Sequence, residues 1–324
     1  MRKSLAALLA LALACALLLG GCMPAAPEEE LRVEVALPEV PEDLERDESG
    51  VPLLRVYDTE AQAVCEMDIE TYVMGVLAGE MNNSWPQEAL KAQAILARTF
   101  VLKFIETKES SYPGADISTD VREAQAYSEV NINENVRTAV EETRGEVVSY
   151  DAELVQAWFH AHAGGMTELP SVALEYKQED PPYLVPTSSN DSPDAPQSVQ
   201  SWTAKFDADA FAQACADTGV RVGEIRSVEI GATGESGRAA TLLVNGKEVS
   251  APSLRLQLGE NEMKSTLLEK IELRDSQVVM QGRGFGHGVG LSQWGAYQMA
   301  QEGKTAQEIV RHYFRDVDIV RLWE

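Results

Sequence analysis

Five glycines alternate with other residues between Gly282 and Gly290, and this segment limits the folds open to the chain more than any other. Because glycine has no Cβ, such a backbone can adopt unusual angles and approach another chain or a ligand closely. We predict a turn here, between a strand at 277–282 and a helix that opens at Leu291-Ser292-Gln293-Trp294. The spacing lacks the G-x-G-x-x-G order of a dinucleotide-binding turn. Two interpretations stay open, a structural bulge and the wall of a sugar-binding site.

The N-terminal residues predict export. Arg2 and Lys3 precede an apolar run of Ala and Leu that is shorter than the roughly 20 residues of a membrane-spanning helix. The run fits a secretory signal peptide, and it ends in Leu19-Gly20-Gly21-Cys22, which is similar to a bacterial lipobox. We therefore expect residues 1–22 to be a lipoprotein signal peptide and Cys22 to carry the lipid. The alternative is an ordinary signal peptide with an incidental cysteine.

The rest of the chain divides into a tether and a folding body. Residues 23–50 are rich in Pro, Glu and Asp, and such a segment buries too little apolar surface to offset its ordering entropy. We expect an acidic tether that holds the protein off the outer face of the cytoplasmic membrane. Residues 51–324 can build a substantial core. Within them we expect two lobes around a cleft, made from 51–200, a strand-rich segment 201–280 and a C-terminal part 281–324.

Charge and cysteines narrow the class of protein. The formal net charge is −25, which argues against nucleic acid as a partner, because phosphate backbones demand basic patches. Binding to a sugar polymer would have to come from a local groove. Cys65 and Cys215 remain after the signal peptide and the lipid site, and the sequence leaves a disulfide between them open.

Two consecutive helices are the clearest predicted elements. Asp68 can cap a helix over 69–80. The sequence Ser84-Trp85-Pro86-Gln87 predicts a second helix to about Lys108, with Ser84 as N-cap and Gln87 closing a capping box. Other helices are expected near 139–144, 208–216 and, with a capping box, from Thr305. Strands are expected at 51–57, 63–67, 145–150, 154–160, 224–230, 238–244, 269–273, 277–282 and 317–322. This mixture without a βαβ rhythm predicts an α+β fold of mostly antiparallel sheets.

Glu80 occupies a position where a core residue is expected. Ile69, Val73 and Val76 share one helix face, and position 80 is the next place on it. The helix dipole also disfavours negative charge in a last turn, so burial and the dipole should both raise the pKa of Glu80. A carboxyl group that stays protonated can donate a proton to a glycosidic oxygen. The alternative is a frayed helix end with Glu80 in solvent.

A His-x-His sequence raises the question of a metal. His160 and His162 end a predicted strand, where both imidazoles could face one ion. They do not complete a zinc site, and His287 and His312 could join them only through folding. We expect a polar wall and no cofactor. The chain has no H-E-x-x-H, no G-x-S-x-G and no recognisable cysteine nucleophile motif, so peptidase chemistry has little support.

Two long motifs resemble the signatures of the stage II sporulation protein D family, which includes proteins called amidase enhancers. The first is Tyr72–Met81, continued by 84–94 and 97–100; the second is the glycine run continued to Ala296. Shorter matches lie between them at 254–255, 258–259 and 264–266. The resemblance spans about 53–322.

The resemblance implies a peptidoglycan lytic transglycosylase that cleaves glycan strands stripped of stem peptides and leaves 1,6-anhydro-muramoyl ends. It places the family's catalytic glutamate on Glu80. That residue would protonate the glycosidic oxygen and then accept a proton as the sugar's C6 hydroxyl attacks C1, so no second carboxylate is needed. The sporulation member acts with an amidase partner during engulfment. A non-catalytic, wall-binding activator of an N-acetylmuramoyl-L-alanine amidase is the alternative.

Further substrate-binding residues are predicted beside Glu80. Arg98 should face the cleft, holding acidic or acetamido groups or tuning Glu80, unless it forms a surface salt bridge. Some family members hold zinc through His and Cys in the region matching 160–191, which here lacks cysteine, so that ligand set is not expected. Tyr183 could stack on a sugar. The complete predicted set is Arg98, Gln93, Tyr183, His160, His287 and Gln293.

Overall fold

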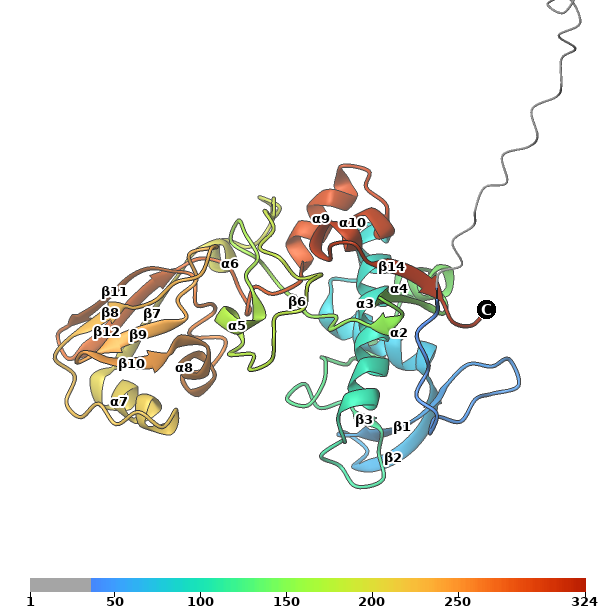
Figure 1. The fold of residues 1–324 in the computed structure, drawn as a ribbon, viewed down its shortest axis with the longest axis horizontal. Coiled ribbons are helices and arrows are strands. Elements are labelled where there is room, and N and C mark those ends of the chain that lie inside the picture. The colour runs from blue at the N-terminus through green and yellow to red at the C-terminus, as the bar shows by residue number, and fades with distance from the viewer. Residues whose placement is uncertain (1–35) are drawn as a thin grey trace, which may run out of the picture. The chain divides into compact units, whose positions relative to one another are not determined.

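The computed structural model of the protein describes residues 36–324, which form one unit by their internal contacts (Figure 1). The predicted signal peptide, the lipid site Cys22 and the start of the tether lie outside the described residues. No helix within 36–324 is long and apolar enough to cross a membrane. Helices and small, mostly antiparallel sheets alternate along the chain, so the predicted α+β class is confirmed.

The helices and strands have the following bounds. The helical elements are α2 (Ile69–Glu80), α3 (Gln87–Thr107), η1 (Glu129–Asn131), α4 (Glu134–Glu142), α5 (Pro170–Ala173), α6 (Gln197–Gln200), α7 (Ala208–Asp217), α8 (Ala251–Leu258), α9 (Gln293–Gln301) and α10 (Ala306–Tyr313). The strands are β1 (Leu53–Asp58), β2 (Ala63–Asp68), β3 (Ile117–Ser118), β4 (Glu146–Tyr150), β5 (Glu153–Leu154), β6 (Phe159–His160), β7 (Trp202–Asp207), β8 (Val228–Ile230), β9 (Thr241–Val244), β10 (Lys247–Ser250), β11 (Leu268–Arg274), β12 (Gln277–Gly282), β13 (Leu291–Ser292) and β14 (Asp318–Arg321).

Five small sheets connect these strands. The orders β14-β4-β5, β11-β12-β7 and β10-β9-β8 are antiparallel throughout. In β2-β1-β3, the short β3 is parallel to β1. The pair β13-β6 is also parallel, and it joins the end of the glycine run to the first histidine of the His-x-His sequence. Segments about 130 positions apart in the chain therefore lie side by side at this pair.

The described residues build two hydrophobic cores. The first surrounds α3, on which α2, α4, α9 and α10 pack (Figure 1). The second lies between the strands β7 to β12 and the helices α7 and α8. Cys65 packs against the first core and Cys215 lies in the second, and both are free thiols. The C-terminal segment belongs to the first core, since Phe314 and Trp323 are buried there.

The start of α2 is as predicted and the start of α3 is not. Asp68 caps α2 by accepting a hydrogen bond from the Thr71 amide at 3.0 Å. The predicted capping box at the start of α3 is wrong, because Ser84 Oγ donates instead to Asn82 Oδ1 at 2.7 Å. Pro86 precedes the helix without any side-chain cap. The capping box predicted at Thr305 is confirmed, with Glu308 as its partner.

Besides the short elements β3, η1, α5, α6 and β13, three longer elements were not predicted: β7, β10 and α8. All three belong to the second core, where β7 pairs with β12 and β10 pairs with β9. These short segments adopt their structure through pairing and packing within the second core, and no pattern in their own sequence predicts it.

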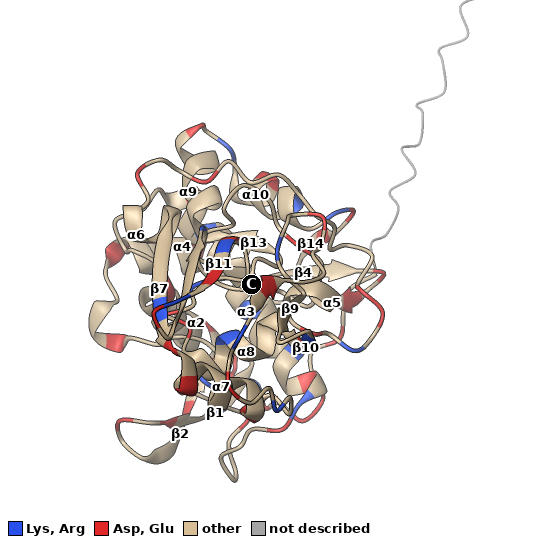
Figure 2. Ribbon diagram, turned by 90° about the vertical axis from the view of Figure 1, so that its left-hand side faces the viewer, with Lys and Arg blue, Asp and Glu red and all other residues tan. Residues whose placement is uncertain are grey.

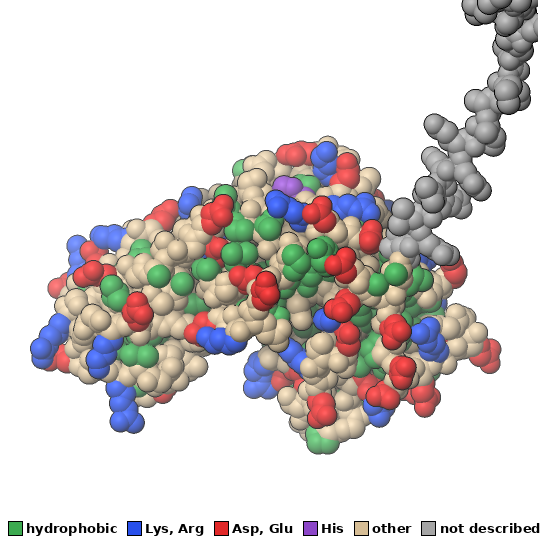
Figure 3. All heavy atoms as spheres, viewed as in Figure 1, with side chains coloured by type: hydrophobic (Ala, Val, Ile, Leu, Met, Phe, Trp, Pro, Cys, Tyr) green, Lys and Arg blue, Asp and Glu red, His purple; other side chains and the backbone are tan. Residues whose placement is uncertain are grey.

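Lys and Arg positions are interspersed with Asp and Glu positions along the ribbon in the view of Figure 2. On the face drawn in Figure 3, Lys and Arg are interspersed with Asp and Glu in the same way. These views therefore show no broad basic surface of the kind that binds a phosphate backbone.

Candidate active-site groove

Glu80 is the last residue of α2, and its carboxylate accepts a hydrogen bond from a neighbouring segment of the chain. Its Oε1 accepts a hydrogen bond from the Ala126 amide at 2.7 Å. Two helix glycines make this approach feasible. A Cβ on Gly79 would lie 2.7 Å from backbone atoms of Ala126, and one on Gly75 would lie 2.1 Å from the Tyr127 ring. The small residues of the first motif thus let the segment around Ala126 pack directly onto α2.

A groove of about 620 Å³ opens beside Glu80. Aromatic and polar side chains both line it, a combination that suits sugar rings with their apolar faces and polar edges. The residues that line it are Glu80, Phe100, Val121, Ala124, Gln125, Trp158, Phe159, His160, Ala161, Arg255, Glu260, Asn261, Phe285, Gly286, His287 and Gln293.

The groove contains one carboxylate without an ion pair. Two glutamates line it, and Glu260 is paired with Arg255 at 2.7 Å. Glu80 has no charged partner within residues 36–324. Burial raises the pKa of the Glu80 carboxyl, and the hydrogen bonds from the Ala126 amide and the Gln293 side chain oppose that rise without cancelling it. Glu80 therefore keeps its proton to a higher pH than an exposed glutamate would.

Replacing Glu80 by glutamine is expected to increase the free energy of unfolding at neutral pH. Because the pKa is raised in the folded state, the contribution of Glu80 to stability is complete below its ordinary pKa. That contribution is lost as the pH rises through the folded-state pKa, whereas glutamine does not titrate. Denaturant unfolding of both proteins at several pH values checks this, with no difference expected in acid. A variant less stable than the parent at neutral pH would contradict it.

The glycine run fits both interpretations proposed from the sequence. Gly284, Gly286 and Gly290 all have positive φ, at 78°, 100° and 70°. A Cβ on Gly290 would lie 2.0 Å from the Trp158 carbonyl oxygen, so the run must be bare where it packs against the segment of β6. The same run supplies Phe285, Gly286 and His287 to the groove. The run therefore packs tightly against the segment of β6 and also forms one wall of the groove.

The two histidines of the His-x-His sequence face different partners. His160 lines the groove 5.7 Å from His287 by ring centroids, and its Nδ1 lies 3.1 Å from the Val289 carbonyl oxygen. His162 Nδ1 lies 3.4 Å from a carboxylate oxygen of Asp191. Burial lowers the pKa of His160 and brings that of His287 to about 3, so both rings are neutral.

The donor set does not fit a zinc site. His160 and His162 are turned toward separate groups, since His160 lies beside His287 and His162 beside Asp191. Across residues 36–324, no group of three or more His, Cys, Asp or Glu side chains is arranged to hold a metal ion.

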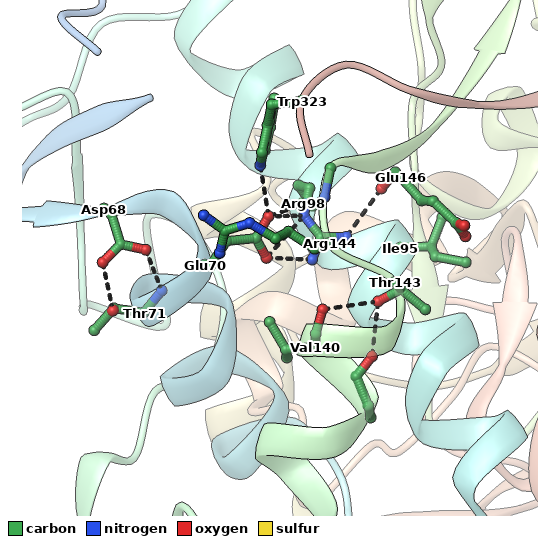
Figure 4. Close-up of polar contacts among 12 residues, drawn as sticks. Asp68, Glu70, Thr71, Ile95, Arg98, Val140, Thr143, Arg144, Glu146 and Trp323 are labelled. Atoms are coloured by element: carbon green, nitrogen blue, oxygen red, sulfur yellow. Dashed lines mark hydrogen bonds and ion pairs between the residues drawn. The ribbon is translucent and has the colours of Figure 1, made fainter. Parts of the chain in front are cut away.

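Arg98 does not lie where it was predicted, either in the cleft or at the surface. Its side chain is 0% exposed and binds Glu70 of α2, with Nε 3.0 Å from Oε1, and it donates to the Glu146 carbonyl at 2.9 Å (Figure 4). Trp323 Nε1 donates to the same carboxylate at 2.8 Å. The Arg98–Glu70 pair therefore ties α2, α3 and β4 together inside the first core, and Glu70 connects the pair to the C-terminal segment.

Tyr183 and Gln93 also lie outside the groove lining, contrary to prediction. The Tyr183 ring is buried against Tyr150 and Phe314, and its hydroxyl accepts from the Gln156 amide at 2.8 Å. Gln93 is fully buried on α3. Both side chains are buried in the protein instead. From the sequence alone, an aromatic or amide side chain is equally compatible with a cleft and with the core.

The groove brings together His160, His287 and Gln293 with Glu80. Gln293 Nε2 lies 3.4 Å from the Glu80 carbonyl oxygen. Gln125 and Trp158 also line the groove and were not predicted from the sequence. Trp158 directly precedes the His-x-His region and could have been noticed there, whereas Gln125 has no local signal.

Comparison with known proteins gives consistent matches. A family model described as stage II sporulation protein matches residues 57–150. The stage II sporulation protein D of Bacillus subtilis is 32% identical over 282 residues, which cover 82% of this chain and 78% of that protein. An uncharacterized protein of Brachyspira hyodysenteriae is 31% identical over 82% of this chain and 70% of its own. The amidase enhancer of B. subtilis is 26% identical over 74% of this chain and 39% of its own length.

Proposed function

The chain belongs to the stage II sporulation protein D family, and from this premise we propose that it is a peptidoglycan lytic transglycosylase with Glu80 as both acid and base. The observation that carries the proposal is the single unpaired carboxylate in the groove, with its raised pKa. A glycosidase that positions a water requires two carboxyl groups, whereas an intramolecular attack requires one. The groove has one unpaired carboxylate, and it therefore supports the intramolecular attack.

The proposed reaction proceeds in two proton transfers at Glu80. The protonated carboxyl donates to the glycosidic oxygen as the bond from C1 to that oxygen breaks, which releases one end of the strand. The C6 hydroxyl of the same sugar then forms a bond to C1 and gives its proton to the Glu80 carboxylate. The products are an anhydro-sugar end and a free hydroxyl end, and Glu80 is protonated again.

The surroundings of Glu80 support each transfer. Burial favours the protonated form before cleavage, and the Ala126 amide stabilises the carboxylate that exists between the two steps. The aromatic side chains Phe100, Trp158 and Phe285 offer apolar faces for sugar rings.

The setting of the reaction is part of the proposal. A signal peptide and lipidation at Cys22 would place the protein on the outer face of the cytoplasmic membrane, where glycan strands are accessible. The names of its relatives support a role in sporulation and an amidase as functional partner. An amidase removes stem peptides and would supply the strands that this groove accepts.

The similarity to an amidase enhancer favours a second candidate, a wall-binding activator without catalysis. The two candidates share the groove and differ in the fate of the strand. In the enzyme, Glu80 is essential to bond cleavage; in the activator, it contributes to binding only.

The products of digestion test the proposal. Purified protein is incubated with amidase-treated, peptide-free glycan strands, and the products are identified by mass spectrometry. The proposal expects fragments that are lighter by one water molecule than the corresponding hydrolysis products. Fragments that contain the added water would instead indicate hydrolysis. Strand binding without any cleavage would favour the activator.

A further inference from the structure

Gln125 is a buried amide with no partner. It lines the groove next to Ala126, the residue that holds Glu80, and it is 2% exposed. Neither its Oε1 nor its Nε2 has a hydrogen-bond partner within residues 36–324. An amide buried in this way lowers stability unless a ligand or solvent satisfies it. Its place in the groove wall indicates that the ligand supplies the partner.

His160 offers a second free group, and its hydrogen-bond role can be derived. The ring is neutral, and its Nδ1 faces the Val289 carbonyl oxygen, which can only accept. Nδ1 therefore carries the proton, and Nε2 is an acceptor. That Nε2 is buried in the groove wall, where no group among the described residues bonds to it.

Two residues that line the groove thus hold a buried group without a partner among the described residues: an acceptor on His160 and an amide donor on Gln125. A trans secondary amide directs its N–H and its C=O to opposite sides, so its recognition needs one acceptor and one donor. Its methyl group needs apolar contact, which Val121 and Ala124 provide from the same segment as Gln125. A hydroxyl group would use the two polar atoms but not this apolar surface.

We propose that Gln125 and His160 bind the acetamido group of an N-acetylated sugar in the groove. Gln125 Nε2 donates to the acetamido oxygen, and His160 Nε2 accepts from the acetamido N–H. This inference rests on the proposed function, since it takes the ligand to be an acetylated glycan. It makes Gln125 a specificity-determining residue, which selects acetylated over deacetylated strands.

Binding measurements on a cleavage-disabled background test the inference. The Glu80→Gln variant is titrated with N-acetylated glycan oligosaccharides, with the same oligosaccharides after deacetylation, and with a re-acetylated sample. High salt screens the attraction between the exposed amines and the acidic protein. We expect deacetylation to weaken binding by about 10- to 100-fold and re-acetylation to restore it.

Adding Gln125→Leu should remove this selectivity. The affinity for the acetylated ligand should fall by a similar factor, so that both ligands bind nearly equally. The midpoint of thermal unfolding should stay the same or rise, because leucine replaces an unbonded amide with an apolar side chain of similar size. A purely structural role for Gln125 would instead lower that midpoint.

Two further variants complete the experiment. Gln301→Leu makes the same exchange at an exposed position on α9 and should keep the full selectivity. His160→Leu should reduce selectivity as Gln125→Leu does, and it keeps the inference testable if the latter fails to fold. Selectivity that persists in the Gln125 or His160 variant would overturn the inference. Because strand cleavage is not measured, selectivity would survive even if the parent protein proved inactive, and the proposed function alone would then fail.

Discussion

Replacing Glu80 by glutamine is expected to slow the cleavage of peptide-free glycan strands by about 10²- to 10⁴-fold, the usual contribution of a positioned acid or base. Glutamine has nearly the same shape but cannot give up or accept the proton that each step requires. Strand affinity should change by only a few fold, because the groove and its aromatic wall stay intact. The measurement is the initial rate of anhydro-end formation, with a separate binding titration.

The pH dependence of the cleavage rate of the parent protein should also report the titration of Glu80. Cleavage by the free enzyme needs protonated Glu80, so the rate should fall as the pH rises through the pKa of Glu80. Burial places that pKa above the ordinary value of a glutamate, and the fall should therefore occur at a higher pH than an exposed glutamate would give. The residual rate of the variant should lack this transition.

A matched control separates this effect from a general effect of charge. Glu142 is also the last residue of a helix, but it is exposed and pairs with Lys91 away from the groove. Glu142→Gln should keep the parent rate and pH profile. If Glu80→Gln cleaved strands at the parent rate, Glu80 could not be the acid.

Replacing Arg98 by methionine is expected to lower the free energy of unfolding by about 3–5 kcal/mol, because it leaves the Glu70 carboxylate buried without its cation. Both side chains are almost completely buried, and Glu70 also accepts hydrogen bonds from Trp323 and the Gly145 amide (Figure 4). Equilibrium unfolding in denaturant measures the change.

Two comparisons identify the cause of this loss. Arg122→Met removes an arginine that also pairs with a carboxylate but is 84% exposed, and it should lower the free energy of unfolding much less than Arg98→Met does, because water screens an exposed pair. Combining Arg98→Met with Glu70→Leu removes both charges and should recover much of the stability. A loss in Arg98→Met no larger than that of Arg122→Met would show that the buried pair contributes little.

Structural features that depend on residues close together in the chain could be predicted from the sequence. The helix at 69–80 and its cap at Asp68 were correct, since capping and helical periodicity involve residues three or four positions apart. The same periodicity continued the stripe of Val73 and Val76 to Glu80; the two valines are buried and Glu80 is half-buried. By contrast, Ser84 had the right spacing for a capping box but found a closer partner in Asn82.

The position of Arg98 could not be predicted from local patterns in the sequence. Its sequence position leaves a cleft, a surface and the core all open, and only the fold brings Glu70, the Glu146 carbonyl and Trp323 around it. Tyr183 was misplaced for the same reason, because an aromatic ring suits a sugar site and a core equally well. In both cases the deciding partners are distant in the chain.

The sequence by itself determined the α+β class, the helix that ends at Glu80, and the need for a bare backbone in the glycine run, because propensity and periodicity are local properties. Only the tertiary structure decided which side chains meet Glu80. It added Gln125 and Trp158 to the groove, kept His160 and His287, and moved Arg98 and Tyr183 into the core. The physical reason is that burial and hydrogen-bond partners arise from contacts between distant segments, which no local pattern specifies.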